Sequence, residues 1–168
     1  METILIVDDE KNTLKMLSQG LKMRGYQALT AASGEEALQQ CIQSDVDLVL
    51  LDIRMENGMD GVQTLVKLRE RYPDLSVVMM SAQKEIKTAV QTMELGAKRY
   101  LTKPLGIDEI ISNVQPFLEI SRLAQENQML RSQITPTEDM VGESDVISNL
   151  RMQIEKVAPS KLLSLIHI

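Results

Sequence analysis

The sequence has very few aromatic side chains, a single cysteine and a single histidine. Phe, Trp and Tyr make up 2% of the 168 residues, so aliphatic side chains and 11 methionines must fill the core. The only cysteine, Cys41, excludes an internal disulfide and fits a reducing cytoplasm. It lies in a helical pattern, where we expect a buried structural thiol. The only histidine, His167, has no Cys, His or carboxylate beside it, which argues against a metal or catalytic role.

Long apolar runs and an excess of positive charge are also lacking. No run of about 18 apolar residues occurs, so the sequence predicts no membrane span. The N-terminal stretch METILIVDDE has no basic region followed by an apolar stretch, which argues against a secretory signal. The formal net charge of −6 argues against broad electrostatic binding to nucleic acid or to an anionic membrane. We therefore expect a cytoplasmic globular protein with no membrane partner.

Strand-like and helix-like patterns alternate through about the first 120 residues. Short runs of aliphatic and β-branched residues predict strands at 3–8, 26–31, 47–51, 75–80 and 99–102. Apolar residues at helical spacing follow each strand, and a long last helix begins near Ile107. Five buried strands alternating with helices predict an α/β fold with a parallel sheet covered on both faces. The favoured topology is a flavodoxin-like, doubly wound sheet of order 2-1-3-4-5 with an extended C-terminal helix.

A polar or charged residue stands at the end of four of the predicted strands. The first strand ends in Asp8 and Asp9, and Asp52 follows the third strand, Ser81 the fourth and Lys103 the fifth. In the order 2-1-3-4-5 the first and third strands are neighbours, and the fourth lies beside the third. Ligands of such sheets bind outside the carboxyl ends of the strands, where the strand order reverses. We therefore expect these five side chains to meet in one pocket.

The chemistry of this pocket follows from its groups. Three carboxylates close together repel one another unless a cation lies between them or their pKa values are raised. An all-oxygen site suits Mg²⁺, and a carboxylate beside Mg²⁺ can attack a phosphoryl group to form an aspartyl phosphate. Lys103 would balance charge on the transferred oxygens, and Ser81 would donate a hydrogen bond. Singly, each residue could merely cap a helix or end a strand, but their joint occurrence favours a site.

These residues lie in motifs that resemble those of response-regulator receiver domains. The stretches ILIVDDE, DLVLLDIRM, GMDG, VVMMSA and YLTKPL match that family in order and in spacing over about residues 1–120. The loop after Met55 departs from the family, because the usual Pro is missing and ENG makes the loop one residue longer. The proposed nucleophile is unaffected by this departure, whereas the conformation of the loop is not predicted by the resemblance.

The resemblance implies a role for each residue of the pocket. Asp52 would accept a phosphoryl group from a phosphohistidine on a sensor histidine kinase, and Lys103 would pair with the phosphoryl group. Ser81 would be the switch hydroxyl and Tyr100 the aromatic switch residue, although a half-buried core tyrosine is a plain alternative. The implied Mg²⁺ ligands are Asp8, Asp9, Asp52 and the backbone carbonyl of Arg54.

The segment at 121–137 is predicted to be a linker helix beyond the receiver domain at 1–120. Steps of three and four, as between the a and d positions of a coiled coil, separate Ile120, Leu123, Asn127, Leu130 and Ile134, with the polar Asn127 at an a position. We expect a homodimer through the receiver and the helix at 120–134. Two heptads are too short to dimerise alone, so a single amphipathic signalling helix is the alternative.

The segment at 138–168 is interpreted as the truncated start of an output domain. The stretch MVGESDVISNLRMQIEKVAPS resembles the opening of the AAA+ ATPase domain of sigma-54-dependent transcriptional activators. No G-x-x-x-x-G-K phosphate loop follows it, so the sequence carries no ATPase motif and is expected to be a fragment or a truncated reading. Contact with DNA and with sigma-54 RNA polymerase would occur only through parts missing from this chain.

Two other classes of function stay open at this point. A phosphorylation-independent interaction or dimerisation module would keep the pocket only as a vestige. A phosphatase of the haloacid-dehalogenase type also uses acids, Ser or Thr, Lys and Mg²⁺. That class needs D-x-D on the first strand, whereas Asp8, Asp9 and Glu10 stand there. We interpret the chain as a phosphoacceptor signalling protein rather than an enzyme with an external substrate.

Overall fold

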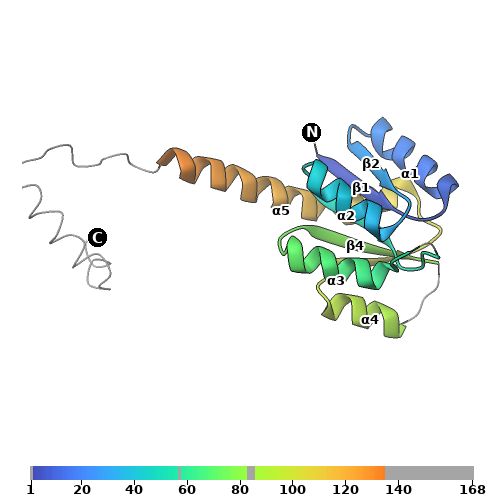
Figure 1. Cartoon of the computed structure of the whole chain (residues 1–168). Coiled ribbons are helices and arrows are strands. Elements are labelled where there is room, and N and C mark those ends of the chain that lie inside the picture. The colour runs from blue at the N-terminus through green and yellow to red at the C-terminus, as the bar shows by residue number, and fades with distance from the viewer. Residues whose placement is uncertain (1, 57, 83–85, 135–168) are drawn as a thin grey trace, which may run out of the picture. The chain divides into compact units, whose positions relative to one another are not determined.

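The computed structural model describes residues 2–56, 58–82 and 86–134 (Figure 1). Strands and helices alternate along these residues, as predicted. The elements are β1 (Thr3–Val7), α1 (Lys11–Met23), β2 (Gln27–Ala31), α2 (Gly34–Gln43), β3 (Leu48–Asp52), α3 (Gly61–Arg71), β4 (Ser76–Ser81), α4 (Ile86–Glu94), β5 (Arg99–Thr102) and α5 (Ile107–Ile134). The predicted strands lie within one residue of the observed ones. Asp52 and Ser81 are the last residues of their strands rather than the first residues after them.

The strands form one parallel sheet of order β2-β1-β3-β4-β5. This confirms the predicted flavodoxin-like topology. In register, Val7 of β1 pairs with Leu51 of β3, and Leu51 pairs with Met79 of β4. The carboxyl ends of β1, β3 and β4 are therefore level with one another at a single edge of the sheet.

Both faces of the sheet are buried under helices. Successive side chains of a strand point to opposite faces, so each strand contributes to two cores. Ile4 and Ile6 contribute to a core that the apolar sides of α1 and α5 cover. Leu5 and Val7 contribute to a second core, which α2 and α3 cover. Leu14, Leu17 and Leu21 of α1, which recur at helical spacing, are buried in the first core. Cys41, expected to be buried, is half-buried beside the second core.

Polar side chains that accept backbone N–H groups set the starts of α2 and α3. At α2 the Ser33 hydroxyl accepts the Glu36 N–H at 3.2 Å. Glu36 Oε2 in turn accepts the Ala32 N–H at 2.7 Å. In a standard capping box the Glu side chain would instead accept the N–H of the capping residue, here Ser33. Asp60 caps α3 in the same way and accepts the Gln63 N–H at 2.7 Å. These caps fix where α2 and α3 begin.

The last helix, α5, extends well beyond the sheet (Figure 1). It contains Pro116 without ending there, so this proline does not restart the helix. A compact unit comprises Met1–Asn127, and the predicted linker begins inside α5. The output segment at 138–168 lies outside the described residues, as do the last residues of the linker. Within the described ranges, no helix has the length and apolar character needed to cross a bilayer.

Candidate functional site

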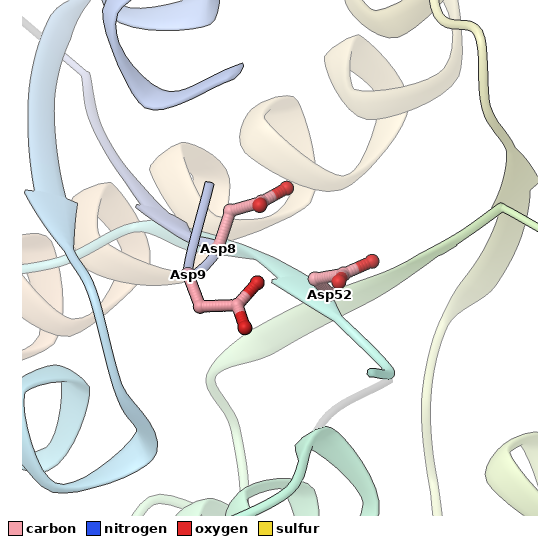
Figure 2. A group of neighbouring side chains, drawn as sticks. All are labelled: Asp8, Asp9 and Asp52. Carbon is pink, nitrogen blue, oxygen red and sulfur yellow. The ribbon is translucent and has the colours of Figure 1, made fainter. Parts of the chain in front are cut away.

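Three aspartates converge at the carboxyl edge of the sheet, as the sequence predicted. Asp8 and Asp9 directly follow β1, and Asp52 ends β3, the strand beside it (Figure 2). One carboxylate oxygen of each residue lies within 4.8 Å of the corresponding oxygens of the other two. Asp8 and Asp52 are 1% and 5% exposed, whereas Asp9 is half-buried. The site is therefore a closely spaced oxygen cluster that solvent reaches mainly on the side of Asp9.

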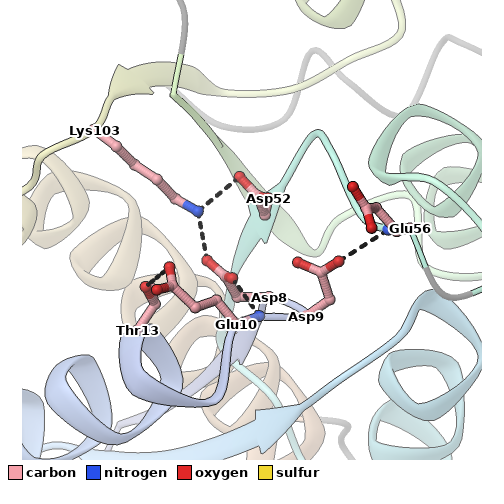
Figure 3. A network of polar contacts seen from close by, with 7 residues as sticks. All are labelled: Asp8, Asp9, Glu10, Thr13, Asp52, Glu56 and Lys103. Carbon is pink, nitrogen blue, oxygen red and sulfur yellow. Dashed lines mark hydrogen bonds and ion pairs between the residues drawn. The ribbon is translucent and has the colours of Figure 1, made fainter.

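Lys103 directly follows β5, which β3 and β4 separate from β1, and its ammonium reaches the acid cluster (Figure 3). Its Nζ lies 2.6 Å from Oδ2 of Asp8 and 2.9 Å from Oδ1 of Asp52. The main chain of Lys103 is held as well, because its N–H donates to the Ser81 carbonyl at 2.7 Å. This bond continues the β4–β5 ladder past Thr102. The Lys103 ammonium thus pairs with two buried carboxylates, whose negative charges would otherwise repel each other.

The pKa values of Asp52 and Lys103 are both raised, for different reasons. Burial raises the pKa of Asp52, the Lys103 ammonium opposes that rise, and Asp8 and Asp9 add to it. Burial by itself would lower the pKa of Lys103, but its bonds to Asp8 and Asp52 outweigh burial and raise the pKa. Three carboxylates and one ammonium leave two negative charges unbalanced. This donor set fits a hard divalent cation such as Mg²⁺.

Backbone N–H groups orient the two carboxylates that follow β1 (Figure 3). Oδ1 of Asp8 accepts the Glu10 N–H at 2.9 Å, which leaves Oδ2 directed at Lys103. Oδ2 of Asp9 accepts the Glu56 N–H at 2.9 Å, from the loop that follows β3. Sequence reasoning did not find either donor, because every residue except proline carries this group.

The remaining predicted residues lie around the same edge. Ser81 is 4% exposed at the end of β4, one residue beyond Met80, the register partner of Asp52. Tyr100 lies in β5, is half-buried and packs beside the second core. Arg54 follows Asp52 by two residues, and its side chain is exposed. The structure therefore places Ser81 next to the acid cluster, and Tyr100 on the neighbouring strand.

Gly61 allows α3 to approach the end of β3 directly. A Cβ at this position would lie 2.0 Å from the Asp52 carbonyl oxygen and 2.7 Å from the Ile53 Cα. The Gly61 N–H also donates to the Ile53 carbonyl at 3.0 Å. The residue after Asp52 is thus held against the start of α3 at a distance that no side chain permits.

A buried aspartate at the end of a central parallel strand, bridged to a lysine and flanked by two further acids, characterises a phosphoacceptor class of signalling domain. In agreement with this class, residues 4–115 match the family described as response regulator receiver domain. The chain belongs to this family. The resemblance that the motifs predicted is therefore confirmed.

Similar proteins extend the match beyond the receiver domain. The chain is 32% identical to a putative response regulator NtrX-like protein of Rickettsia felis over 98% of this chain and 35% of that protein. It is 36% identical to the transcriptional regulatory protein ZraR of Escherichia coli (strain K12), over 98% of this chain and 36% of that protein. A crystal structure of NtrX from Brucella abortus is 33% identical with a TM-score of 0.71, covering 95% of this chain and 35% of that one. The chain thus spans about a third of the length of these relatives.

Proposed function

We propose that this receiver domain accepts a phosphoryl group on Asp52 from a phosphohistidine of a sensor histidine kinase, in a Mg²⁺-dependent reaction. The observation that carries the proposal is the geometry around Asp52. This carboxylate is buried at the end of β3, lies 2.9 Å from the Lys103 ammonium and shares an oxygen cluster with Asp8 and Asp9. Family membership supports the same reaction class.

The chemistry needs a nucleophile and a means of neutralising charge. An Asp52 carboxylate oxygen forms the new bond to phosphorus, while the bond from phosphorus to the donor nitrogen breaks and its electron pair leaves with the imidazole. Asp8, Asp9, Asp52 and the backbone carbonyl of Arg54 would hold Mg²⁺, which when bound neutralises charge on the phosphoryl oxygens. Lys103, already directed at Asp52, balances the charge that remains.

The switch is proposed to begin at Ser81. A dianionic phosphoryl group on Asp52 offers the Ser81 hydroxyl a new acceptor across the β3–β4 pair. Movement of Ser81 toward it frees space beside β5, into which Tyr100 rotates. The readout is a changed surface over α4, β5 and α5, produced by a local charge that biases a two-state element.

The output is proposed to be transcriptional and to use a homodimer in the cytoplasm. Two a/d residues of α5, Ile120 and Leu123, are 63% and 52% exposed, and a second copy of the helix would cover them. One relative is a transcriptional regulatory protein, and the match to it includes the segment after the receiver. We assign contact with DNA and with sigma-54 RNA polymerase to parts beyond this chain.

Incubation with acetyl phosphate and Mg²⁺, followed by intact-mass measurement, tests the proposal. We expect a gain of one phosphoryl group that requires Mg²⁺ and that is absent in Asp52→Asn. An exposed aspartate on the same chain, changed in Asp45→Asn, is the matched control and should leave the gain intact. An unmodified wild-type chain would instead favour the phosphorylation-independent interaction module, and steady release of phosphate from an ester would favour the phosphatase.

A further inference from the structure

The loop between β3 and α3 packs closely against the first turn of α2. A Cβ at Gly34, the first residue of α2, would lie 2.1 Å from the Thr64 hydroxyl oxygen and 3.0 Å from the Met59 Cβ. The next residue, Glu35, accepts the Met59 N–H on Oε1 at 3.1 Å. The start of α2 is therefore in direct contact with both the loop and α3.

The carboxylate of Glu35 also fits against the backbone at Gly58. This glycine has a φ of +90°, and a Cβ there would lie 2.6 Å from Glu35 Oε2. Only glycine adopts this conformation readily, and only glycine leaves room for the carboxylate. Both oxygens of Glu35 thus lie against the loop, one accepting the Met59 N–H and the other packed on Gly58.

The same loop is held on its other side by the acid cluster. Asp9 Oδ2 accepts the N–H of Glu56, three positions before Met59. Two carboxylates, one after β1 and one in α2, therefore accept hydrogen bonds from two backbone amides of the same loop. Asp9 belongs to the candidate metal cluster, whereas Glu35 does not. Because the loop starts directly after Asp52, its conformation decides where residues 54–56 lie relative to the cluster.

We infer that Glu35 is a positioning residue for the metal and phosphoryl site: it anchors the β3–α3 loop so that residues 54–56 are presented to Asp9 and Asp52. The inference rests on the proposed function, since it assigns Glu35 a role in the Mg²⁺ affinity of that site. The longer loop, with its glycine at 58 and no proline after Met55, is stabilised by this anchor from α2. Glu35 is ionised at neutral pH, because its own backbone N–H and then the Ser33 hydroxyl and Met59 N–H lower its pKa against a smaller effect of burial.

A purely local role for Glu35 gives different expectations. A carboxylate in the first turn of a helix stabilises the helix through its charge alone. Glu35→Gln removes that charge but keeps a side-chain oxygen able to accept the Met59 N–H, whereas Glu35→Ala removes both. Gln39→Ala, at an exposed position one turn further along α2, is the matched control for truncation.

The first measurement is Mg²⁺ binding to the full chain by titration calorimetry. We expect Glu35→Ala to weaken Mg²⁺ binding about tenfold, the lower end of the range for residues that support metal ligands. Glu35→Gln and Gln39→Ala should bind Mg²⁺ as the wild type does. Equal weakening in Glu35→Ala and Glu35→Gln would assign the effect to helix charge and overturn the inference.

The second measurement is amide hydrogen exchange in the Mg²⁺-free chain, read at Met59 and at Glu56. Loss of the acceptor in Glu35→Ala should speed exchange at Met59 directly. The decisive site is Glu56, whose N–H bonds to Asp9 rather than to Glu35, and its exchange should speed up too. Exchange at Glu56 that stays at the wild-type rate, with wild-type Mg²⁺ affinity, would overturn the inference while leaving the proposed function standing. A wild-type chain that neither binds Mg²⁺ nor gains a phosphoryl group would overturn the proposed function itself.

Discussion

The Lys103 ammonium lies 2.6 Å from the Asp8 carboxylate, although 95 positions separate the two residues in the sequence. Asp8 directly follows β1 and Lys103 directly follows β5, and β3 and β4 lie between those two strands. The pair forms because Lys103 extends across the carboxyl edge, where Asp52 accepts a second bond from the same nitrogen. The Lys103 ammonium thus stabilises the two buried carboxylates, Asp8 and Asp52, when no metal is bound.

Replacing this lysine should slow phosphorylation far more than it changes binding of the phosphoryl donor. Lys103→Met keeps most of the length of the side chain but removes the ammonium, so charge on the transferred oxygens loses one partner. We expect the rate of phosphorylation by acetyl phosphate to fall about 100-fold, as for loss of one preorganised donor. Intact mass against time measures the rate. Lys98→Met, at an exposed position just before β5, is the control, and equal rates in the two variants would contradict the assignment of Lys103.

The raised pKa of Asp52 predicts a pH-dependent stability difference. Its usual value is 3.8, and burial raises it in the folded chain against the opposing Lys103 ammonium. Between the unfolded and folded values, the folded chain holds a proton that the unfolded chain has released. The stability that protonated Asp52 contributes is therefore fully present below the pKa of the unfolded chain. It is lost as the pH rises through the pKa of the folded chain. Asp52→Asn, which cannot ionise, should unfold at higher urea concentration than the wild type at pH 7.

The advantage of Asp52→Asn should shrink as the pH falls toward 3.8, the usual pKa of the group that it replaces. Urea titrations of both chains at several pH values measure the difference. An advantage of constant size across this range would show that packing, not ionisation of Asp52, is responsible.

Magnesium should stabilise the chain, and the effect should depend on Asp9. A ligand present at 100 times its dissociation constant adds about 2.7 kcal/mol to the free energy of unfolding. Asp9→Asn keeps the shape of the side chain but loses the charge, so most of this gain should disappear. Thermal melts with Mg²⁺ and with a chelator measure it. Asp74→Asn, at an exposed site in the turn before β4, should respond to Mg²⁺ as the wild type does; a full response in Asp9→Asn would remove Asp9 from the ligand set.

Gly61→Ala should destabilise the fold and displace the end of β3. Its Cβ would meet the Asp52 carbonyl oxygen at 2.0 Å, where backbone on both sides leaves little room to yield. Overpacking of this kind costs about 1–3 kcal/mol. Gly106→Ala is the matched control, because a Cβ there meets no heavy atom within 4 Å. Urea unfolding of the two variants should separate them, and similar midpoints would mean that α3 can move away from β3 at no cost.

The exposed stripe of α5 predicts the oligomeric state of the chain. Leu123→Glu places a charge on the a/d stripe and should shift a dimer toward monomer in sedimentation experiments. Ser121→Glu adds the same charge off the stripe and should leave the association unchanged. A wild-type chain that sediments as a monomer at all concentrations and phosphorylation states would instead support the single signalling helix.

Local patterns in the sequence determined most of the fold. Alternating apolar runs specify strands, and spacing such as Leu14, Leu17 and Leu21 specifies a helix face, because both periods are properties of a few successive residues. The rules for parallel crossovers then limit the topology. Together, the local patterns and the crossover rules place Asp8, Asp9, Asp52, Ser81 and Lys103 at one edge of the sheet.

The tertiary structure alone decided how that edge is held together. The bonds from Lys103 to both Asp8 and Asp52, and from the Glu56 N–H to Asp9, join segments that only the completed sheet brings together. Glu35 is similar: its sequence position indicates the first turn of a helix, and only the packing of α2 on the β3–α3 loop places Met59 within reach. Backbone donors occur in every residue except proline, and close approaches depend on how distant segments pack. No local sequence pattern can therefore predict either of them.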